Sequence, residues 1–474
     1  MEAKLLVRAY NVGFGDCIYV RIPSRHGGFH ILIDCGTLGN IKLLRQAIEH
    51  LKSELPEADV PGTKRLDLIV ATHRHADHLK GFEAAWFQDI QVRNIWISVG
   101  MDPAHPQAEK VRQVRSLAQS SMGKLLASGQ RLDGDVAQLA SFFGASNENA
   151  EKLILETLPK KNRIEPKFVH SGMNAKELGL ENLPSSTSID VLGPEKDIDH
   201  YYLGKQADGL LRRFSSGFAK ARSEPTRVDP SDPSDPSAPI PTIPKNISRG
   251  DFEKLRSRIA SNGLEFARME SSIQNNLSVV LMITWRKRRL LFVGDAEWNG
   301  EYLEGKRNGS WNVMWEKHYE KHLCEPIDFL KVGHHGSANS TPWIMDETKR
   351  KKSQADVGIG SLLDTLLPVH RRGKSKASAI ISTERRREPT IPDGRLLLEL
   401  ARRVGSVRNY AESLQNLGID PSTIWERNAK SSEDLYKDRE KPYLSSPQPL
   451  RTDLEAELSE IGQRYLEVEF EPGD

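Results

Sequence analysis

The chain has few cysteines and no long apolar run. Its 474 residues include three cysteines, Cys17, Cys35 and Cys324, and no two of them stand in CxxC spacing. A disulfide framework and a cysteine zinc site are therefore not supported, and we expect reduced thiols. No stretch of 18 apolar residues occurs, and the N-terminus enters a strand-like pattern without a signal peptide. These absences predict a cytoplasmic protein with no membrane partner.

The sequence also has little net charge. Lys and Arg number 67 against 65 Asp and Glu, which gives a formal net charge of +2. A local excess of basic residues nevertheless occurs between 343 and 390, where eleven Lys or Arg, including Arg371 and Arg372, face six Asp or Glu. Such a stretch can contact phosphates, and it can equally be a solvated loop.

Apolar segments with strand-like composition alternate with helical patterns in two separate parts of the chain. The order is a strand pair, a helix at 40–55, a strand ending in histidines, and later a hairpin, further strands and a helix. This order predicts an α/β fold with αββα layering, in which two sheets lie back to back with helices outside. The expected core consists of residues 1–90 and 272–400.

The remaining residues are assigned to an insertion and a C-terminal extension. Residues 91–271 have a mixed, mostly helical pattern and form the expected insertion. Within it, 223–244 is rich in Pro, Ser and Asp, which is too proline-dense for a helix or a sheet. We interpret that segment as a disordered surface loop. Residues 401–474, with a strand-like "RYLEVEF" near the end, form an extension without an assigned role.

The stretch "ATHRHADHLKG" at 71–81 concentrates three of the fourteen histidines at the end of a short apolar strand. Open α/β sheets place ligand sites at the carboxyl ends of their strands. His73 and His75 have the i, i+2 spacing that directs two side chains the same way, so they can hold one ion, while Asp77 and His78 turn toward a neighbouring ion. Imidazole and carboxylate ligands suit zinc, with manganese or iron as alternatives.

Two later strands also end in residues that bind metals. Asp295 ends the segment "LLFVGDAE", and His334 and His335 end "LKVGHHGS". Hydrolytic two-metal sites often hold their ions about 3.5 to 4 Å apart, and a carboxylate can bridge them. Asp295 suits that bridge, although a Gly-Asp pair after a strand also suits a plain turn.

Together, "NVGFGD", "ILIDCG", "THRHADH", "VGDAE" and "VGHHGS" resemble the motifs of the metallo-β-lactamase fold. Within that fold, the chain is similar to the hydrolase domain of ComEC-type DNA-uptake proteins. The likeness covers residues 4–90 and 272–400. It implies a four-layer αββα sandwich that binds two divalent metal ions, but it does not determine the substrate, since one fold hosts many functions.

The resemblance also implies roles for single residues. His73 and His75 correspond to ligands of the first metal, Asp77 and His78 to ligands of the second, and Asp295 to the carboxylate between them. One of His334 and His335 is expected to close the first site, and the other to face the substrate. Asp34 of "ILIDCG" corresponds to a residue that supports the histidine loop, or is a polar turn residue.

Two departures from the family pattern affect the expected site. Many members have a further metal-binding histidine where this chain has Gln274, Asn275 and Asn276, so we expect a weaker and more open second site. ComEC-like chains tend to have His-Pro where this chain has Ile391-Pro392. Close to the histidine pair, Lys331 points either into the site or into solvent, and Ser337 is expected to face the substrate.

The function that the resemblance favours is metal-dependent hydrolysis of phosphodiesters, most plausibly by a nuclease acting on DNA or RNA in DNA processing or defence. Two metal ions would lower the pKa of a bridging water from about 15.7 to about 7. Asp77 would take the proton of that water. The basic turn at 286–289 and the basic stretch with Arg371 and Arg372 would bind backbone phosphates.

Two alternatives remain open on the sequence alone. The same centre could hydrolyse a small ester, such as a cyclic nucleotide, a lactone or a phosphorylcholine ester. The chain could also be a metal-stabilised scaffold that docks a protein partner through the insertion or the C-terminal extension. Retention of the ligand set argues against the scaffold.

Overall fold

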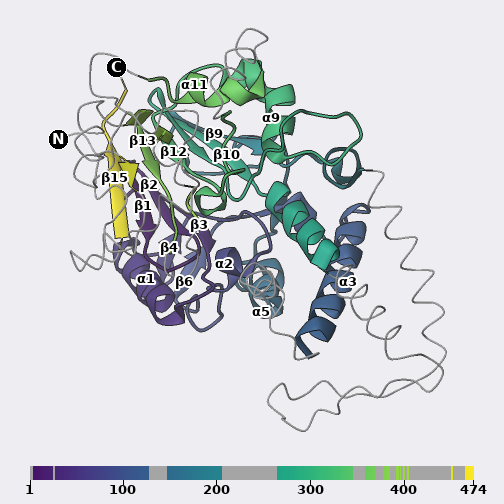
Figure 1. Cartoon of the computed structure of the whole chain (residues 1–474). Helices are drawn as coiled ribbons and strands as arrows, with labels where there is room; N and C mark the ends of the chain where they lie inside the picture. The colour runs from purple at the N-terminus through teal and green to yellow at the C-terminus, as the bar shows by residue number, and fades with distance from the viewer. Residues whose placement is uncertain are drawn as a thin grey trace, which may run out of the picture.

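The computed structural model (Figure 1) describes residues 4–24, 27–127, 147–204, 264–344, 358–369, 377–384, 391–393, 396, 399–400, 403–404, 450–451 and 465–473. The loop 223–244, interpreted above as disordered, lies outside the described residues, as do Arg371 and Arg372.

Two large sheets and one small sheet make up the strand structure. The seven-stranded sheet has the order β15 (Tyr465–Phe470), β1 (Leu5–Tyr10), β2 (Cys17–Ile22), β3 (Phe29–Cys35), β5 (Leu68–Ala71), β7 (Ile95–Ser98) and β8 (Lys167–Val169). The six-stranded sheet has the order β14 (Leu450–Arg451), β13 (Ser378–Ile380), β12 (Phe329–Lys331), β11 (Arg288–Phe292), β10 (Val280–Trp285) and β9 (Thr187–Gly193). A two-stranded sheet pairs β4 (Lys64–Leu66) with β6 (Ile90–Val92).

Helices cover the outer faces of the two large sheets. The α-helices of the described residues include α1 (Ile41–Glu54), α2 (Ala76–Leu79), α3 (Ala108–Ala127), α5 (Glu148–Lys152), α6 (Leu158–Asn162), α9 (Ser310–His318) and α11 (Leu362–Leu366). Residues 264–276 are helical as well. Short 3-10 turns occupy η1 (Val99–Met101), η5 (His334–Gly336) and η6 (Ile359–Ser361), and π-helical turns occupy η2 (Leu153–Thr157), η3 (Asp199–Leu203) and η4 (Tyr319–Leu323). Figure 1 shows α1 and α11 on opposite sides of the strands.

The burial pattern explains this layering. Residues of β3 alternate between two cores: Ile31 and Ile33 pack with Leu281 and Phe292 of the other sheet, whereas Leu32 packs beneath α1. A strand that is covered on both faces is apolar at successive positions, as β3 is. A third core lies under α9 and α11 on the outer face of the six-stranded sheet. The predicted αββα arrangement is therefore confirmed.

Helix α1 shows how local sequence sets one of these layers. Its apolar residues Leu44, Ala47, Ile48 and Leu51 are buried at helical spacing, while the opposite face is polar. The side chain of Asn40 accepts hydrogen bonds from the first-turn amides of Lys42 and Leu43, which satisfies donors that a helix start leaves unpaired. The helix expected at 40–55 is thus present almost at its predicted bounds.

The insertion and the extension contain strands that the sequence analysis did not assign to the sheets. The 91–271 segment supplies β7, β8 and β9, and the 401–474 segment supplies β14 and β15, which pairs antiparallel with β1 from Leu5↔Phe470 to Tyr10↔Tyr465. The sequence analysis did not assign these strands to the sheets, because runs of two to seven residues are too short for periodicity to identify. The predicted domain boundaries stay a prediction.

No helix among the described residues is long and apolar enough to cross a membrane.

Candidate metal centre

The candidate site lies where four strands end at one edge of the sandwich. In the seven-stranded sheet, β3 and β5 run parallel, and their carboxyl ends deliver Asp34 and the His73 loop. In the six-stranded sheet, β11 and β12 run parallel and are followed by Asp295 and His335. Because parallel strands end at the same edge of a sheet, these polar side chains meet although they are far apart in sequence.

Among the described residues, the side chains form two groups that share Asp295 and a third group of Asp16, Asp34 and His78, and within each group the ligand atoms all lie within 4.8 Å of one another. The two groups that share Asp295 are the candidate metal ligands. One group is His73, His75 and Asp295, and the other is Asp77, His78, Asp295 and His335. All are buried. The structure therefore brings together the expected ligands His73, His75, Asp77, His78 and Asp295, and Asp295 belongs to both groups, where the bridging carboxylate was expected.

The two neighbouring histidines of the "HHGS" segment have different positions. His335 lies with Asp77 and His78 and therefore belongs to the second group. The sequence analysis had expected one of the two histidines to complete the first group. The side chain of His334 is 23% exposed, with Nε2 3.3 Å from Asn275 Nδ2 and Nδ1 2.9 Å from Ser337 Oγ. Both residues have positive φ, 44° and 52°, a conformation that non-glycine residues keep mainly where the surroundings enforce it.

Outer hydrogen bonds fix the protonation pattern of two histidines in the second group. His78 Nδ1 lies 2.7 Å from Asp34 Oδ2, and His335 Nδ1 lies 2.8 Å from the carbonyl oxygen of Ser382. Because both partners only accept, each Nδ1 must carry the proton that it donates. When these imidazoles are neutral, each Nε2 is an acceptor directed at the carboxylates, 3.2 Å from Asp295 Oδ2 for His78 and 2.9 Å from Asp77 Oδ2 for His335.

Acceptors that face each other at this distance need a cation or a proton between them. Without a metal, protons fill the role: although burial works against it, the carboxylates of Asp295, Asp34 and Asp77 raise the pKa of His78 well above its usual range. Asp77 Oδ1 is buried and has no hydrogen-bond partner, and His78 Nε2 faces the Asp295 carboxylate at 3.2 Å. This arrangement fits a divalent metal, whose ligating histidines donate their other ring nitrogen to a carboxylate or a carbonyl.

The first group has neutral imidazoles. Burial lowers the pKa of His73 well below its usual range and lowers that of His75 to about 4. The hydroxyl of Thr72 donates to Asp34 Oδ2 at 2.7 Å. Its oxygen, Thr72 Oγ1, can therefore accept a hydrogen bond from His73 Nδ1, which lies 3.1 Å away. That leaves His73 Nε2, 3.7 Å from Asp295 Oδ2, as a ligand atom. Neutral imidazole is the form that binds metals.

Asp34 holds the histidine loop, as the resemblance implied. Its carboxylate accepts hydrogen bonds from the amide and the hydroxyl of Thr72, at 2.8 and 2.7 Å, as well as from His78. The residue adopts a φ of 57° to present both oxygens to the loop.

We expect Asp34→Asn to weaken metal binding by about 10- to 100-fold, the usual effect of losing a group that orients a ligating histidine. The amide can donate to His78 Nδ1, which would move the imidazole proton to Nε2 and block the ligand atom. Competition with a chelating dye measures the affinity. Asp328→Asn, at the amino end of β12, is the control, and equal affinity for both variants would contradict the assigned role.

Three other predicted residues contact protein groups. Asn275 and Asn276 donate from Nδ2 to the two oxygens of Glu297, at 2.8 and 3.0 Å. Ser337 Oγ lies 2.9 Å from His334 Nδ1 and donates to Asn339 Oδ1, and its contact with a substrate stays a prediction. Glu297 was missed, although its position two residues after Asp295 was a usable signal.

Lys331 and Asp16 form a buried ion pair beside the site. Lys331 Nζ donates to Asp16 Oδ2 at 2.9 Å and to the carbonyl of Val332 at 3.0 Å, and both side chains are only 2% exposed. Asp16 forms a cluster with Asp34 and His78, so Lys331 points toward the site, the first of its two expected directions. Its contact with a substrate stays a prediction. Asp16, which ends the "NVGFGD" motif, was not named as a site residue. With it and Glu297, the described site has five buried carboxylates, Asp16, Asp34, Asp77, Asp295 and Glu297, against Lys331, a balance that favours cations.

The basic turn does not lie at this site. Strand β10 runs away from the metal-binding edge, so the turn at Arg286 and Lys287 lies at the opposite end of the sheet from Asp295. Arg288 pairs there with Asp328 at 2.7 Å, and Arg289 Nη1 donates to the carbonyl of Pro326. The turn is therefore far from a substrate held at the metals, which strand direction shows and composition does not. Phosphate binding by this turn stays a prediction.

Comparison with known proteins supports the first half of the site. Residues 10–115 match the family model described as the metallo-beta-lactamase superfamily, and this segment contains Asp34, His73, His75, Asp77 and His78. The comparison with curated proteins gave no match. Asp295 and His335 lie beyond the matched segment and are placed beside it by the fold alone.

Proposed function

We propose that the chain is a metal-dependent phosphodiesterase of the metallo-β-lactamase type, and that its substrate is DNA or RNA. The observation that carries the hydrolase part is that one buried carboxylate, Asp295, belongs to both ligand groups. Two cations that share a carboxylate are an established arrangement for hydrolysis. We propose zinc as the metal, with manganese as the alternative, because imidazole outnumbers carboxylate among the ligand side chains.

The residues present suit this reaction. Bound metals would lower the pKa of a water molecule and polarise a phosphoryl oxygen. Asp34 and the carbonyl of Ser382 keep His78 and His335 in the tautomer with Nε2 facing inward. Asp77 Oδ2 lies by His335, whereas its Oδ1 is buried and makes no hydrogen bond. We assign Asp77 Oδ1 to hold the proton of the attacking water.

The choice of nucleic acid rests on two features of the sequence. The motifs resemble those of ComEC-type hydrolase domains, and the stretch from 349 to 376 is basic. Phosphate contacts of this kind bind without reading bases. We propose a role in DNA processing or defence in the cytoplasm, with Arg371 and Arg372 among the phosphate-binding residues and His334 at the rim nearest the substrate.

Digestion of labelled single- and double-stranded DNA and of RNA, in parallel with bis(p-nitrophenyl) phosphate and with Zn²⁺ or Mn²⁺, tests the proposal. We expect turnover of the small diester and of at least one nucleic acid. Hydrolysis of small esters without any nuclease activity would favour a cyclic nucleotide, lactone or phosphorylcholine ester as the substrate. Metal binding without any hydrolysis would favour a scaffold that docks a protein partner.

A charge-neutralised variant tests the nucleic-acid part separately. Replacing Arg371, Arg372, Lys374 and Lys376 by Gln should weaken DNA turnover and flatten its salt dependence, because each phosphate contact adds about −0.9 to the log-log slope on duplex DNA. Hydrolysis of bis(p-nitrophenyl) phosphate should stay unchanged. The matched control replaces the exposed Lys160, Arg163, Lys167 and Lys176 by Gln. Equal effects of both quadruple variants on DNA turnover would refute the assignment.

A further inference from the structure

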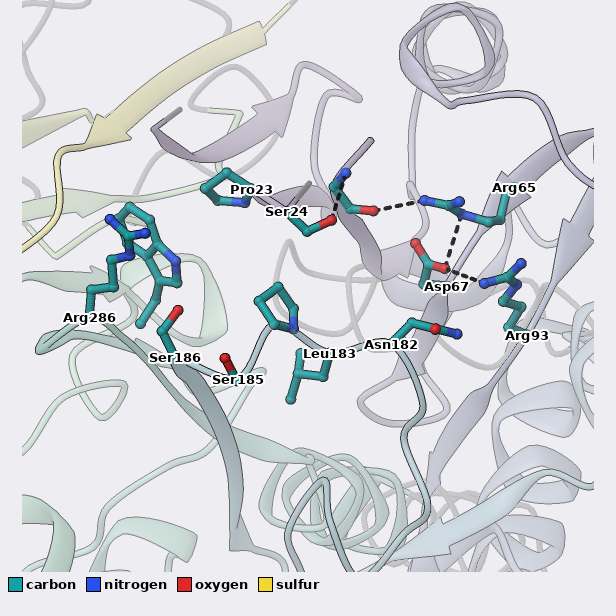
Figure 2. A pocket seen from close by; sticks show the side chains of 13 residues that line it. Pro23, Ser24, Arg65, Asp67, Arg93, Asn182, Leu183, Ser185, Ser186 and Arg286 are labelled. Atoms are coloured by element: carbon teal, nitrogen blue, oxygen red, sulfur yellow. Dashed lines mark hydrogen bonds and ion pairs between the residues drawn. The ribbon is translucent and has the colours of Figure 1, made fainter. Parts of the chain in front are cut away.

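A cavity of about 950 Å³ lies between the loops at the opposite end of the sandwich from the metal centre (Figure 2). Three arginines, Arg65, Arg93 and Arg286, line it, against one carboxylate, Asp67. The rest of the wall consists of serine, asparagine, proline, leucine and tryptophan side chains. The lining therefore carries an excess of positive charge, which favours an anionic ligand.

Strand direction separates this cavity from the metal centre. Gly28 of the cavity wall precedes β3, which runs seven residues to the edge where Asp34 lies. At about 3.3 Å per residue, the two places are about 20 Å apart. Trp285 of the wall ends β10, which starts near the metal-binding edge. A ligand in this cavity is thus not the substrate bound at the metals.

One end of the cavity holds a pair of oriented guanidinium groups. Arg65 Nε lies 3.2 Å from Asp67 Oδ1, and Arg93 Nη1 lies 3.7 Å from the same oxygen. Asp67 is itself fixed, because its Oδ2 accepts the amide of His30 at 2.9 Å. Arg65 Nη2 also donates to the carbonyl of Gly28 at 2.8 Å. Arg93 remains 29% exposed, and its Nη2 lies 3.3 Å from Asp59 Oδ2, an ion pair that solvent screens because the Asp59 side chain is 79% exposed. The buried carboxylate thus holds two guanidinium groups side by side, and the guanidinium fork matches phosphate oxygens.

The other end holds Arg286. Its guanidinium lies over the ring of Trp285, 5.6 Å from the ring centroid. The turn that carries it places two non-glycine residues, Arg286 and Lys287, at φ values of 44° and 66°, and the amide of Gly473 donates to the carbonyl of Arg286 at 2.9 Å. Figure 2 shows Arg286 on the opposite side of the cavity from Arg65 and Arg93, with Leu183 and Ser185 between them.

We propose that this cavity binds a ligand with two phosphate groups separated by an uncharged portion, as in a 5′-phosphorylated dinucleotide. One phosphate contacts Arg93 and Arg65, the other contacts Arg286, and the uncharged portion lies along Leu183 and the neighbouring serines. The ligand connects the loops of one sheet with the β10–β11 turn of the other. It therefore stabilises the folded chain, by a free energy that grows with the logarithm of its concentration over its dissociation constant.

Isothermal titration of the full chain with 5′-phosphorylated thymidine dinucleotide tests the proposal. Excess EDTA keeps metals out of the other site. We expect one binding event per chain, weakened about 10-fold or more by Arg93→Gln and by Arg286→Gln, since each change removes a charge-assisted hydrogen bond to a phosphate. Arg289→Gln, in the same hairpin but directed at Pro326, should bind like the unaltered chain.

A comparison of ligands with one and two phosphates distinguishes binding at both ends of the cavity from nonspecific attraction of an anion to the arginines. Thymidine 5′-monophosphate, with one phosphate, should bind at least about 10-fold more weakly, by the same reasoning. Arg93→Lys should retain more affinity than Arg93→Gln, and thermal unfolding shows whether each variant folds. Absence of binding at millimolar dinucleotide would overturn the proposal. Equal affinity of the mono- and the dinucleotide, or of Arg286→Gln and Arg289→Gln, would overturn it too.

Discussion

Asp295→Ala is expected to lower the metal content of the chain to one ion or none and to reduce phosphodiester turnover by about 10²- to 10³-fold, the range seen when one group that stabilises transition-state charge is removed. Asp295 belongs to both ligand groups. Without it, His73 and His75 are the only members left in the first group, whereas Asp77, His78 and His335 remain in the second. The first ion should therefore be lost more readily.

This order reverses the expectation from sequence. The missing histidine near Asn275 had suggested that the second site is the weaker one, but His335 joins that site. Elemental analysis after dialysis against graded chelator concentrations gives the ion count, and bis(p-nitrophenyl) phosphate gives the turnover. Glu325→Ala, whose carboxylate is 73% exposed, is the control. Retention of two ions and full turnover by Asp295→Ala would show that Asp295 is not a shared ligand.

Gly36→Ala should destabilise the chain by about 3 kcal/mol or more, at the upper end of what overpacking costs. A Cβ on Gly36 would lie 2.2 Å from the backbone carbon of Asp77 and from the nitrogen of His78. Helix α2 would have to move away from β3, and it carries two of the ligands. Because the obstacle is backbone and not a flexible side chain, the neighbour cannot turn aside.

Gly123→Ala is the matched control for that variant. Gly123 lies in α3, and an added Cβ meets no atom within 4 Å. Alanine in a helix is favoured over glycine by about 0.5–1 kcal/mol, so this variant should be slightly more stable. Urea unfolding in EDTA compares the free energies of unfolding without a contribution from metal binding. Equal stability of Gly36→Ala and the unaltered chain would mean that α2 does not pack on β3 as described.

Part of the site could be predicted because its chemistry is concentrated in short segments. Four potential ligands within six residues, directly after an apolar strand, identify His73, His75, Asp77 and His78 without knowledge of the fold. The difference between His334 and His335 depends instead on two successive positive φ values, which the letters HHG do not specify. Likewise, the pairing of Lys331 with Asp16 joins residues 315 positions apart, and only the packing of the two sheets brings them together.

The fold could be predicted where patterns are long and not where they are short. The apolar spacing of α1 and the two hairpins was sufficient for their assignment. Strands β7 and β8, with four and three residues, lack a readable period, and they lie in a region with helical neighbours. The basic turn shows a different limit: its composition suggested phosphate binding, but only the direction of β10 shows that it lies far from the metals.

The central claim is that the chain holds two metal ions that share Asp295, and elemental analysis of the unaltered chain tests it most directly. The chain should be purified without chelator, stripped, reconstituted with Zn²⁺ or Mn²⁺ and dialysed before the ions are counted against protein concentration. The geometry predicts about two ions per chain, since the two buried groups provide six different ligand side chains. No bound metal before stripping, and no uptake after reconstitution, would contradict the account.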